Sequence, residues 1–135
     1  IKHSMRHRKK GKKLGVKPAH RKSLLMNLAS NLIKHGKIKT TDSRAKALRM
    51  YIEPLVTKAK KGDFNSIRQI LKSLKSKDIV HKLVHEISPN FINRNGGYTR
   101  IIKLGYREND RASVSYIEFV ESNSSVQSEA GKDKE

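Results

Sequence analysis

The sequence contains no cysteine. This absence excludes disulfide bonds, zinc sites with cysteine ligands and thiol chemistry, and it fits a protein of a reducing compartment. No apolar run approaches the ~18 residues that a membrane-spanning helix needs. No apolar segment follows the first positive charges, as it would in a signal peptide. We therefore expect a cytoplasmic protein without a membrane partner.

Acidic residues are scarce. The 135 residues include 31 lysines and arginines but only 12 aspartates and glutamates, which gives a formal net charge of +19. The first 22 residues hold ten of the cations and no acid, and the first acid of the chain is Asp42. The rest of the chain still carries +9. A charge of this sign and size points to a nucleic acid or an anionic membrane.

Large apolar side chains are rare at the start of the chain. After Ile1, residues 1–19 offer only Met5, Leu14 and Val16, and they include Pro18. We expect an extended basic arm here, because so little apolar surface cannot form a packed element. The arm has no aromatic residue on which a base could stack. Its charges are therefore expected to contact the phosphates of structured, mostly paired nucleic acid.

From His20 the sequence becomes periodic. Leu24, Leu28 and Leu32 form an apolar stripe that predicts a helix ending at Gly36, and Leu25, Ala29 and Ile33 widen the stripe by one position. "KIKT" is a short strand candidate, and a second helix should begin at Asp42, with Pro54 kinking or splitting it. Two further helices are expected, one after Asp63 and one after Ser76 or at Asp78, the latter closed by Pro89.

The last ordered segments should be strands. "YTRIIKLGYR" and "ASVSYIEFVE" are rich in β-branched and aromatic residues and flank "END", a pattern typical of a hairpin. The order of elements predicts an α+β, two-layer domain, with about four helices against a small three-stranded mixed sheet. We expect the arm over residues 1–19, the globular domain over 20–121 and a polar disordered tail over 122–135.

Motifs for catalysis are missing. "GKKLG" does not match a phosphate-binding loop, and the acids are scattered rather than paired for acid–base or two-metal chemistry. His81 and His85 have the i, i+4 spacing of a helical metal pair, but no cysteine joins them, so ordinary surface histidines are favoured. We expect no enzyme, no catalytic residue, no metal, no cofactor and no small-molecule substrate.

Two further segments are candidates for nucleic-acid contact. The second helix carries Arg44 and Lys46 on a face that is either simply solvated or a second phosphate-binding surface. The segment "NRNGGYTR" brings Arg94, Tyr98 and Arg100 beside a Gly-Gly pair. It could seat a nucleotide or be only a turn before a strand, and contact is slightly favoured.

Three blocks of the sequence resemble one known family. "MRHRKKGKKLG", "IKTTDSRAKALRMYIEPLVTKAK" and "NRNGGYTRIIKLGYRENDRASVSYIEFVE" occur in the order seen in the seventeenth protein of the bacterial large ribosomal subunit. The resemblance covers about residues 5 to 121. It implies a two-layer α+β fold, no catalysis and no cofactor. It also implies binding to large-subunit rRNA beside neighbouring ribosomal proteins, near the exit of the nascent-chain tunnel.

The resemblance also implies which residues of the arm contact rRNA. These are Arg6, His7, Arg8, Lys9, Lys10, Lys12, Lys13, His20, Arg21 and Lys22, to which the charge of the arm adds Lys17. A DNA-binding nucleoid-type protein is the alternative, since the same charge would serve it. It would need an exposed recognition helix, and none is convincing here. An RNA-processing enzyme ranks third, because it would need clustered acids or a base–nucleophile pair.

Overall fold

The structure is a computed structural model that describes residues 11–120. The first ten residues of the predicted arm and the predicted tail lie outside the described residues. The elements are α1 (Pro18–His35), β1 (Lys37–Thr41), α2 (Asp42–Lys61), α3 (Phe64–Leu74), α4 (Lys77–Lys82), a π-helical turn η1 (Leu83–Ile87), a 3-10 turn η2 (Ser88–Phe91), β2 (Thr99–Tyr106) and β3 (Ser113–Phe119). This order confirms the expected α+β class.

The sheet has three strands, with β3 in the middle. Both neighbours pair with β3 in antiparallel fashion, so Tyr116 lies opposite Lys39 on β1 and opposite Ile102 on β2. The prediction of a mixed sheet is therefore wrong. Strands β1 and β2 do run in the same direction, but β3 separates them and no parallel pair forms within the described residues. A bulge between Lys103 and Gly105 interrupts the β2–β3 ladder.

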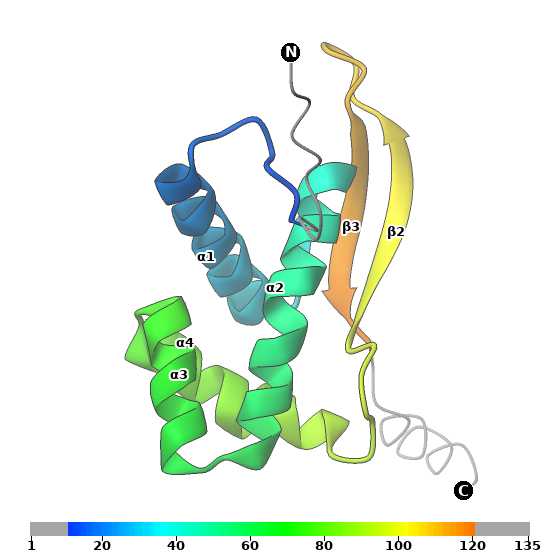
Figure 1. The fold of residues 1–135 in the computed structure, drawn as a ribbon. Coiled ribbons are helices and arrows are strands. Elements are labelled where there is room, and N and C mark those ends of the chain that lie inside the picture. The colour runs from blue at the N-terminus through cyan, green and yellow to red at the C-terminus, as the bar shows by residue number, and fades with distance from the viewer. Residues whose placement is uncertain (1–10, 121–135) are drawn as a thin grey trace, which may run out of the picture.

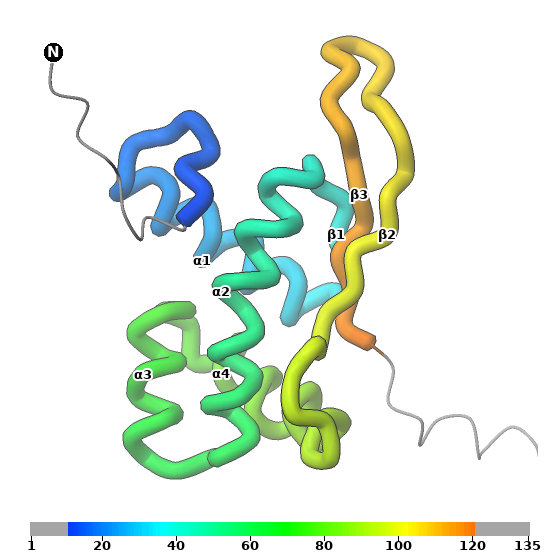
Figure 2. Tube along the Cα trace, turned by 45° about the vertical axis from the view of Figure 1, so that its right-hand side comes forward, coloured from blue at the N-terminus to red at the C-terminus, as the bar shows by residue number. Residues whose placement is uncertain are grey.

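The helices cover one face of the sheet (Figure 1). Helix α2 lies between the sheet and the other helices, and it contacts α1, α3, both short helical turns and all three strands. The tip of the β2–β3 hairpin extends beyond the N-terminal end of α2, as Figure 2 also shows. The domain thus has two layers, and α2 is the element on which both depend.

The core is built around the apolar side of α2. Leu48, Ile52 and Val56 recur at i, i+4 and i+8, and each is fully buried. Helix α1 adds Leu32 and Ile33. The other helices and the strands add further buried side chains, namely Ile70, Leu74, Leu83, Phe91, Tyr98 and Ile117. One continuous cluster therefore joins the two layers.

Helix boundaries differ from expectation at two prolines. Helix α1 begins at Pro18, two residues before His20, because proline suits the first turn, where its missing N–H is not needed. Helix α2 continues through Pro54 and is not split. The carbonyl of Met50 has no intrahelical donor, because Pro54 lacks an N–H group. Both residues are exposed, so this carbonyl can turn toward solvent.

The predicted apolar stripe of α1 is only partly correct. Ala29, Leu32 and Ile33 are buried as predicted, but Leu24, Leu25 and Leu28 are only half-buried. Gly36 ends the helix as predicted, with a left-handed φ of 77° and its N–H bonded to the carbonyl of Leu32 at 2.7 Å. This cap turns the chain directly into β1.

Asp42 fastens the first turn of α2 to the sheet. Its carboxylate accepts hydrogen bonds from the hydroxyls of Ser113, at 2.6 Å, and of Ser115, both on β3. These bonds, the Ser113 bond first, favour the ionised form and lower the pKa of Asp42 below its usual value of 3.8. Asp42 is the only acid among residues 11–52, and it stabilises the fold rather than pairing with a nearby cation.

Leu32→Ala tests the buried face of α1. We expect the free energy of unfolding to fall by about 2–5 kcal/mol, because truncating a fully buried leucine leaves a cavity in the core. Leu28→Ala is the matched control, and its effect should be clearly smaller because Leu28 is half-buried. Urea unfolding of both variants provides the measurement. Equal effects would mean that the helix is turned differently on the core.

Asp42→Asn tests the link between α2 and β3. Since the folded-state pKa of Asp42 is depressed, its contribution to stability is present above the ordinary pKa and is lost as pH falls through the folded-state pKa. We expect the wild type to be more stable than the variant at pH 7. The difference should shrink below about pH 4. Urea unfolding across pH 2–7 measures it, and a pH-independent difference would contradict the assignment.

Candidate nucleic-acid interface

The described part of the arm folds back against the helices. Residues 11–17 make a turn in which Leu14 and Gly15 have left-handed φ values of 57° and 68°. Gly11 and Lys12 then share a surface groove with residues of α1 and α2, namely Arg21, Leu25, Ala47, Met50 and Tyr51. The path of this segment from α2 to the start of α1 is visible in Figure 1. The arm therefore lies beside α2, although no regular element occurs between Gly11 and Pro18.

This path joins two sets of positive charge. The arm and the start of α1 present the exposed side chains of Lys12, Lys13, Lys17, His20 and Lys22, with Arg21 half-buried. The first half of α2 presents Arg44, Lys46 and Arg49, all exposed. We call these nine residues the arm–α2 surface; on α2 they occupy more than one side of the helix, because Arg44 and Lys46 are two positions apart. Residues from separate parts of the sequence that were predicted to contact nucleic acid thus lie on neighbouring elements.

Few of the cations in this protein have an acidic partner. Residues 11–120 hold 24 lysines and arginines, and ion pairs within 4.0 Å involve only Lys37, Arg100 and Arg107 of them. The other 21 have no carboxylate at that distance within this part of the chain, and the eight lysines and arginines of the arm–α2 surface all belong to this group. Such a surface repels itself and attracts polyanions.

Three side chains of α2 hold the loop before β2. The Glu53 carboxylate accepts hydrogen bonds from the backbone N–H groups of Gly97 (3.2 Å) and Thr99 (3.4 Å), and from the Thr99 hydroxyl (3.1 Å). Lys60 donates to the carbonyl of Arg94. Glu53, Thr57 and Lys60 lie on one side of the helix, because they are spaced by four and three residues. The loop is therefore a fixed structure, and Gly97 supplies its left-handed φ of 60°.

Tyr98 does not fit the predicted role in nucleotide contact. Its side chain is only 1% exposed, and its ring packs edge-on against Phe91 at 5.3 Å between centroids. Its hydroxyl lies 3.2 Å from both Thr57 Oγ1 and Lys60 Nζ. We correct the prediction: Tyr98 is a core residue that anchors the loop, because α2 satisfies its hydroxyl and the core covers its ring.

The two arginines of this segment differ in their surroundings. Arg94 is exposed and forms no ion pair within residues 11–120. Arg100 lies on β2, and its guanidinium bonds Glu118 through Nε at 2.8 Å and Nη2 at 2.6 Å. Within the described residues Arg94 is therefore unpaired, while Arg100 is already partly neutralised.

Glu53 and Lys60 are positioning residues that the sequence pattern did not predict. A signal was present, because Glu53 is an isolated acid in a basic helix and shares its spacing with Thr57 and Lys60. What the sequence did not indicate is the partner, which lies more than 30 positions away along the chain.

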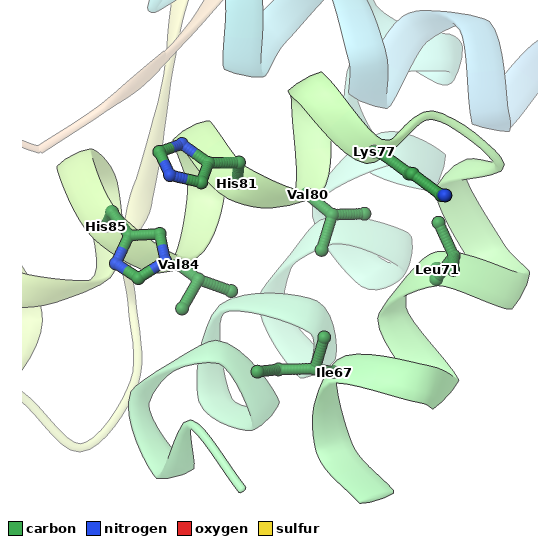
Figure 3. Close-up of a pocket in the computed structure, with 7 residues that line it drawn as sticks. All are labelled: Ile67, Leu71, Lys77, Val80, His81, Val84 and His85. Atoms are coloured by element: carbon green, nitrogen blue, oxygen red, sulfur yellow. The ribbon is translucent and has the colours of Figure 1, made fainter. Parts of the chain in front are cut away.

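An apolar groove lies between α3 and the α4–η1 segment. Ile67, Leu71, Val80 and Val84 line it, with Lys77, His81 and His85 at its margins (Figure 3). The rings of His81 and His85 are 4.3 Å apart between centroids.

Residues 11–120 contain no group of three His, Cys, Asp or Glu side chains that could hold a metal ion. The same part of the chain has no helix of the length and apolarity that crossing a membrane requires.

Glu53→Gln tests the anchoring of the loop. An amide nitrogen cannot accept a hydrogen bond, so we expect donors of the loop to lose partners and the free energy of unfolding to fall by about 1–2 kcal/mol. The amides of Gly97 and Thr99 should exchange with solvent faster, as measured by NMR. Glu108→Gln is the control, because that exposed side chain bonds nothing within residues 11–120. Unchanged exchange in Glu53→Gln would rule out the clamp.

Comparison with known proteins agrees with these features. A family model described as ribosomal protein L17 matches residues 24–120, well over half of the chain. The chain is also 53% identical, over 116 residues, to the large ribosomal subunit protein bL17 of Campylobacter lari. That alignment covers 86% of this chain and 99% of the relative. The chain belongs to the ribosomal protein L17 family, structural proteins of the large subunit of the bacterial cytoplasmic ribosome that are not enzymes.

Proposed function

We propose that this chain binds folded large-subunit rRNA and stabilises it through the phosphates that meet the arm–α2 surface. One observation carries the proposal: 21 of the 24 lysines and arginines in residues 11–120 have no carboxylate within 4.0 Å in that part of the chain. A folded RNA offers the missing negative charge at high density.

The physical gain comes from neutralisation. Each phosphate contacted by a lysine or arginine releases condensed counterions, and this supports binding without reading the base sequence. Helix α2 fixes Arg44, Lys46 and Arg49 on a rigid element, whereas the arm approaches α2 as an irregular segment. The two parts together would hold RNA backbones on two sides.

The proposed contact extends along the whole arm. It includes the cations and histidines Arg6, His7, Arg8, Lys9, Lys10, Lys12, Lys13, Lys17, His20, Arg21 and Lys22, of which the first five lie outside the described residues. Arg94 joins the proposal from the fixed loop, and Arg100 joins it only with a weakened charge because of Glu118. Tyr98 is withdrawn because it is buried.

The proposal has a second part, which concerns position. We place the chain near the exit of the nascent-chain tunnel, next to other proteins of the large subunit. This part is supported by the family resemblance. Membership of a ribosomal family favours rRNA over DNA as the partner, since the relative from Campylobacter lari is a protein of the large ribosomal subunit.

Substitution of Lys12, Lys13 and Lys17 by glutamine tests the role of the arm. The slope of log affinity for large-subunit rRNA against log salt concentration should become shallower by about 0.7–0.9 for each phosphate that the variant no longer neutralises. Filter binding at several salt concentrations gives this slope.

The matched control removes the same charge elsewhere. Lys61, Lys72 and Lys75 are exposed on the last turn of α2, on α3 and just after α3. Their replacement by glutamine should leave the slope closer to that of the wild type. If both triple variants change the slope equally, the arm is not the electrostatic anchor and only the total charge matters.

A further inference from the structure

The face of the sheet that points away from the helices carries its own set of side chains. Side chains alternate between the two faces along each strand, and the cross-strand register shows which residues share a face. Ser115 and Ile117 are fully buried on the helix side, so their neighbours Tyr116 and Glu118 point outward. Cross-strand pairing adds Lys37 and Lys39 from β1 and Arg100 and Ile102 from β2. We call these six residues the outer sheet face.

Tyr116 lies at the centre of this face. It is half-buried on the middle strand, between Lys39 on one side and Ile102, which is 38% exposed, on the other. The ammonium of Lys37 lies 4.2 Å from the centroid of its ring. The Lys37 side chain that covers this face of the ring is flexible and 47% exposed. A ligand that displaces its ammonium therefore reaches one face of Tyr116.

The charge around Tyr116 favours an anion. Three cations surround it against one acid, Glu118, which Arg100 contacts at 2.6 Å and Lys37 at 3.8 Å. Lys39 is exposed and has no ion pair within residues 11–120. An acidic or purely apolar partner would leave either the aromatic ring or the lysines unused. A nucleotide offers both a flat base and a phosphate.

We propose that the outer sheet face holds one unpaired nucleotide of rRNA, with its base stacked on Tyr116. The base takes the place of the Lys37 ammonium, and Lys37 and Lys39 contact the flanking phosphates. Ile102 covers the edge of the base. Open sheet faces with an exposed aromatic ring and nearby cations bind single-stranded nucleotides in this way.

This inference rests on the proposed function but differs from it in kind. The arm has no aromatic residue and suits the backbone of paired RNA, whereas the outer sheet face suits a base that has left its helix. The two surfaces also lie on different elements, the arm and the first half of α2 on one side and the three strands on the other.

Ultraviolet cross-linking of purified large subunits that contain the chain tests the contact directly. Trypsin cleavage after Arg111 and Lys132 releases a peptide in which Tyr116 is the only tyrosine. Mass spectrometry should find a single nucleotide attached at Tyr116. A subunit in which this peptide carries no nucleotide, or is attached to another protein instead, overturns the inference.

Affinity for a large-subunit rRNA transcript gives a second readout. Tyr116→Ser should weaken binding about tenfold because one stacked base loses its platform, while Tyr116→Phe should stay within about twofold of the wild type. Tyr106→Ser is the matched control, because Tyr106 is 74% exposed on the same hairpin but pairs with Ser113 and so points to the opposite face.

The outcomes separate this inference from the proposed function. If Tyr116→Ser binds like the wild type while the arm variant shows a shallower salt slope, the inference fails and the proposed function stands. If neither variant affects binding, both fail. If Tyr116→Phe weakens binding as much as Tyr116→Ser, the hydroxyl rather than stacking is responsible, and the inference is wrong. Urea unfolding of each variant confirms that the fold is retained.

Discussion

Unpaired positive charge is the constraint on which the rest of this structure depends. Lysines and arginines outnumber acids by 24 to 8 in residues 11–120, so the fold must withstand its own repulsion before any partner arrives. Four of the eight acids are committed to fixed hydrogen bonds: Asp42, Glu53, Asp110 and Glu118. They fasten helix to strand, helix to loop, the hairpin turn and the sheet. Negative charge is thus used to hold geometry, and the cations remain available.

Helix α2 joins this charge to the core. One side of it carries Leu48, Ile52 and Val56 into the cluster that both layers share. Another side holds the loop through Glu53, Thr57 and Lys60, and its exposed first half presents arginine and lysine. One helix therefore serves packing, positioning and binding at once. Under the proposed function, rRNA phosphates neutralise the remaining charge.

The sequence predicted whatever depends on local pattern. Helical periodicity, Gly36 and the "END" hairpin indicated the order of elements, and the charge of the arm indicated a polyanion. Features that depend on contacts between distant parts of the chain were not predicted. Tyr98 looked like a nucleotide contact because the sequence does not show that Thr57 and Lys60 meet its hydroxyl, or that Phe91 covers its ring. Leu24 and Leu28 of α1 are less covered than predicted for the same reason: neighbouring elements decide which residues of a stripe are buried. The strand order, likewise, is a property of the whole chain.

The central claim is that the unpaired cations bind rRNA. The most direct test is to measure the acetylation of each lysine in the free protein and in assembled large subunits. The account predicts that Lys12, Lys13, Lys17 and Lys46 react readily in the free protein and become strongly protected in the subunit. Lys61 and Lys72, at the far end of the domain, should be protected less. Equal reactivity of the first four lysines in both states would contradict the account, since it would mean that the charge meets no RNA.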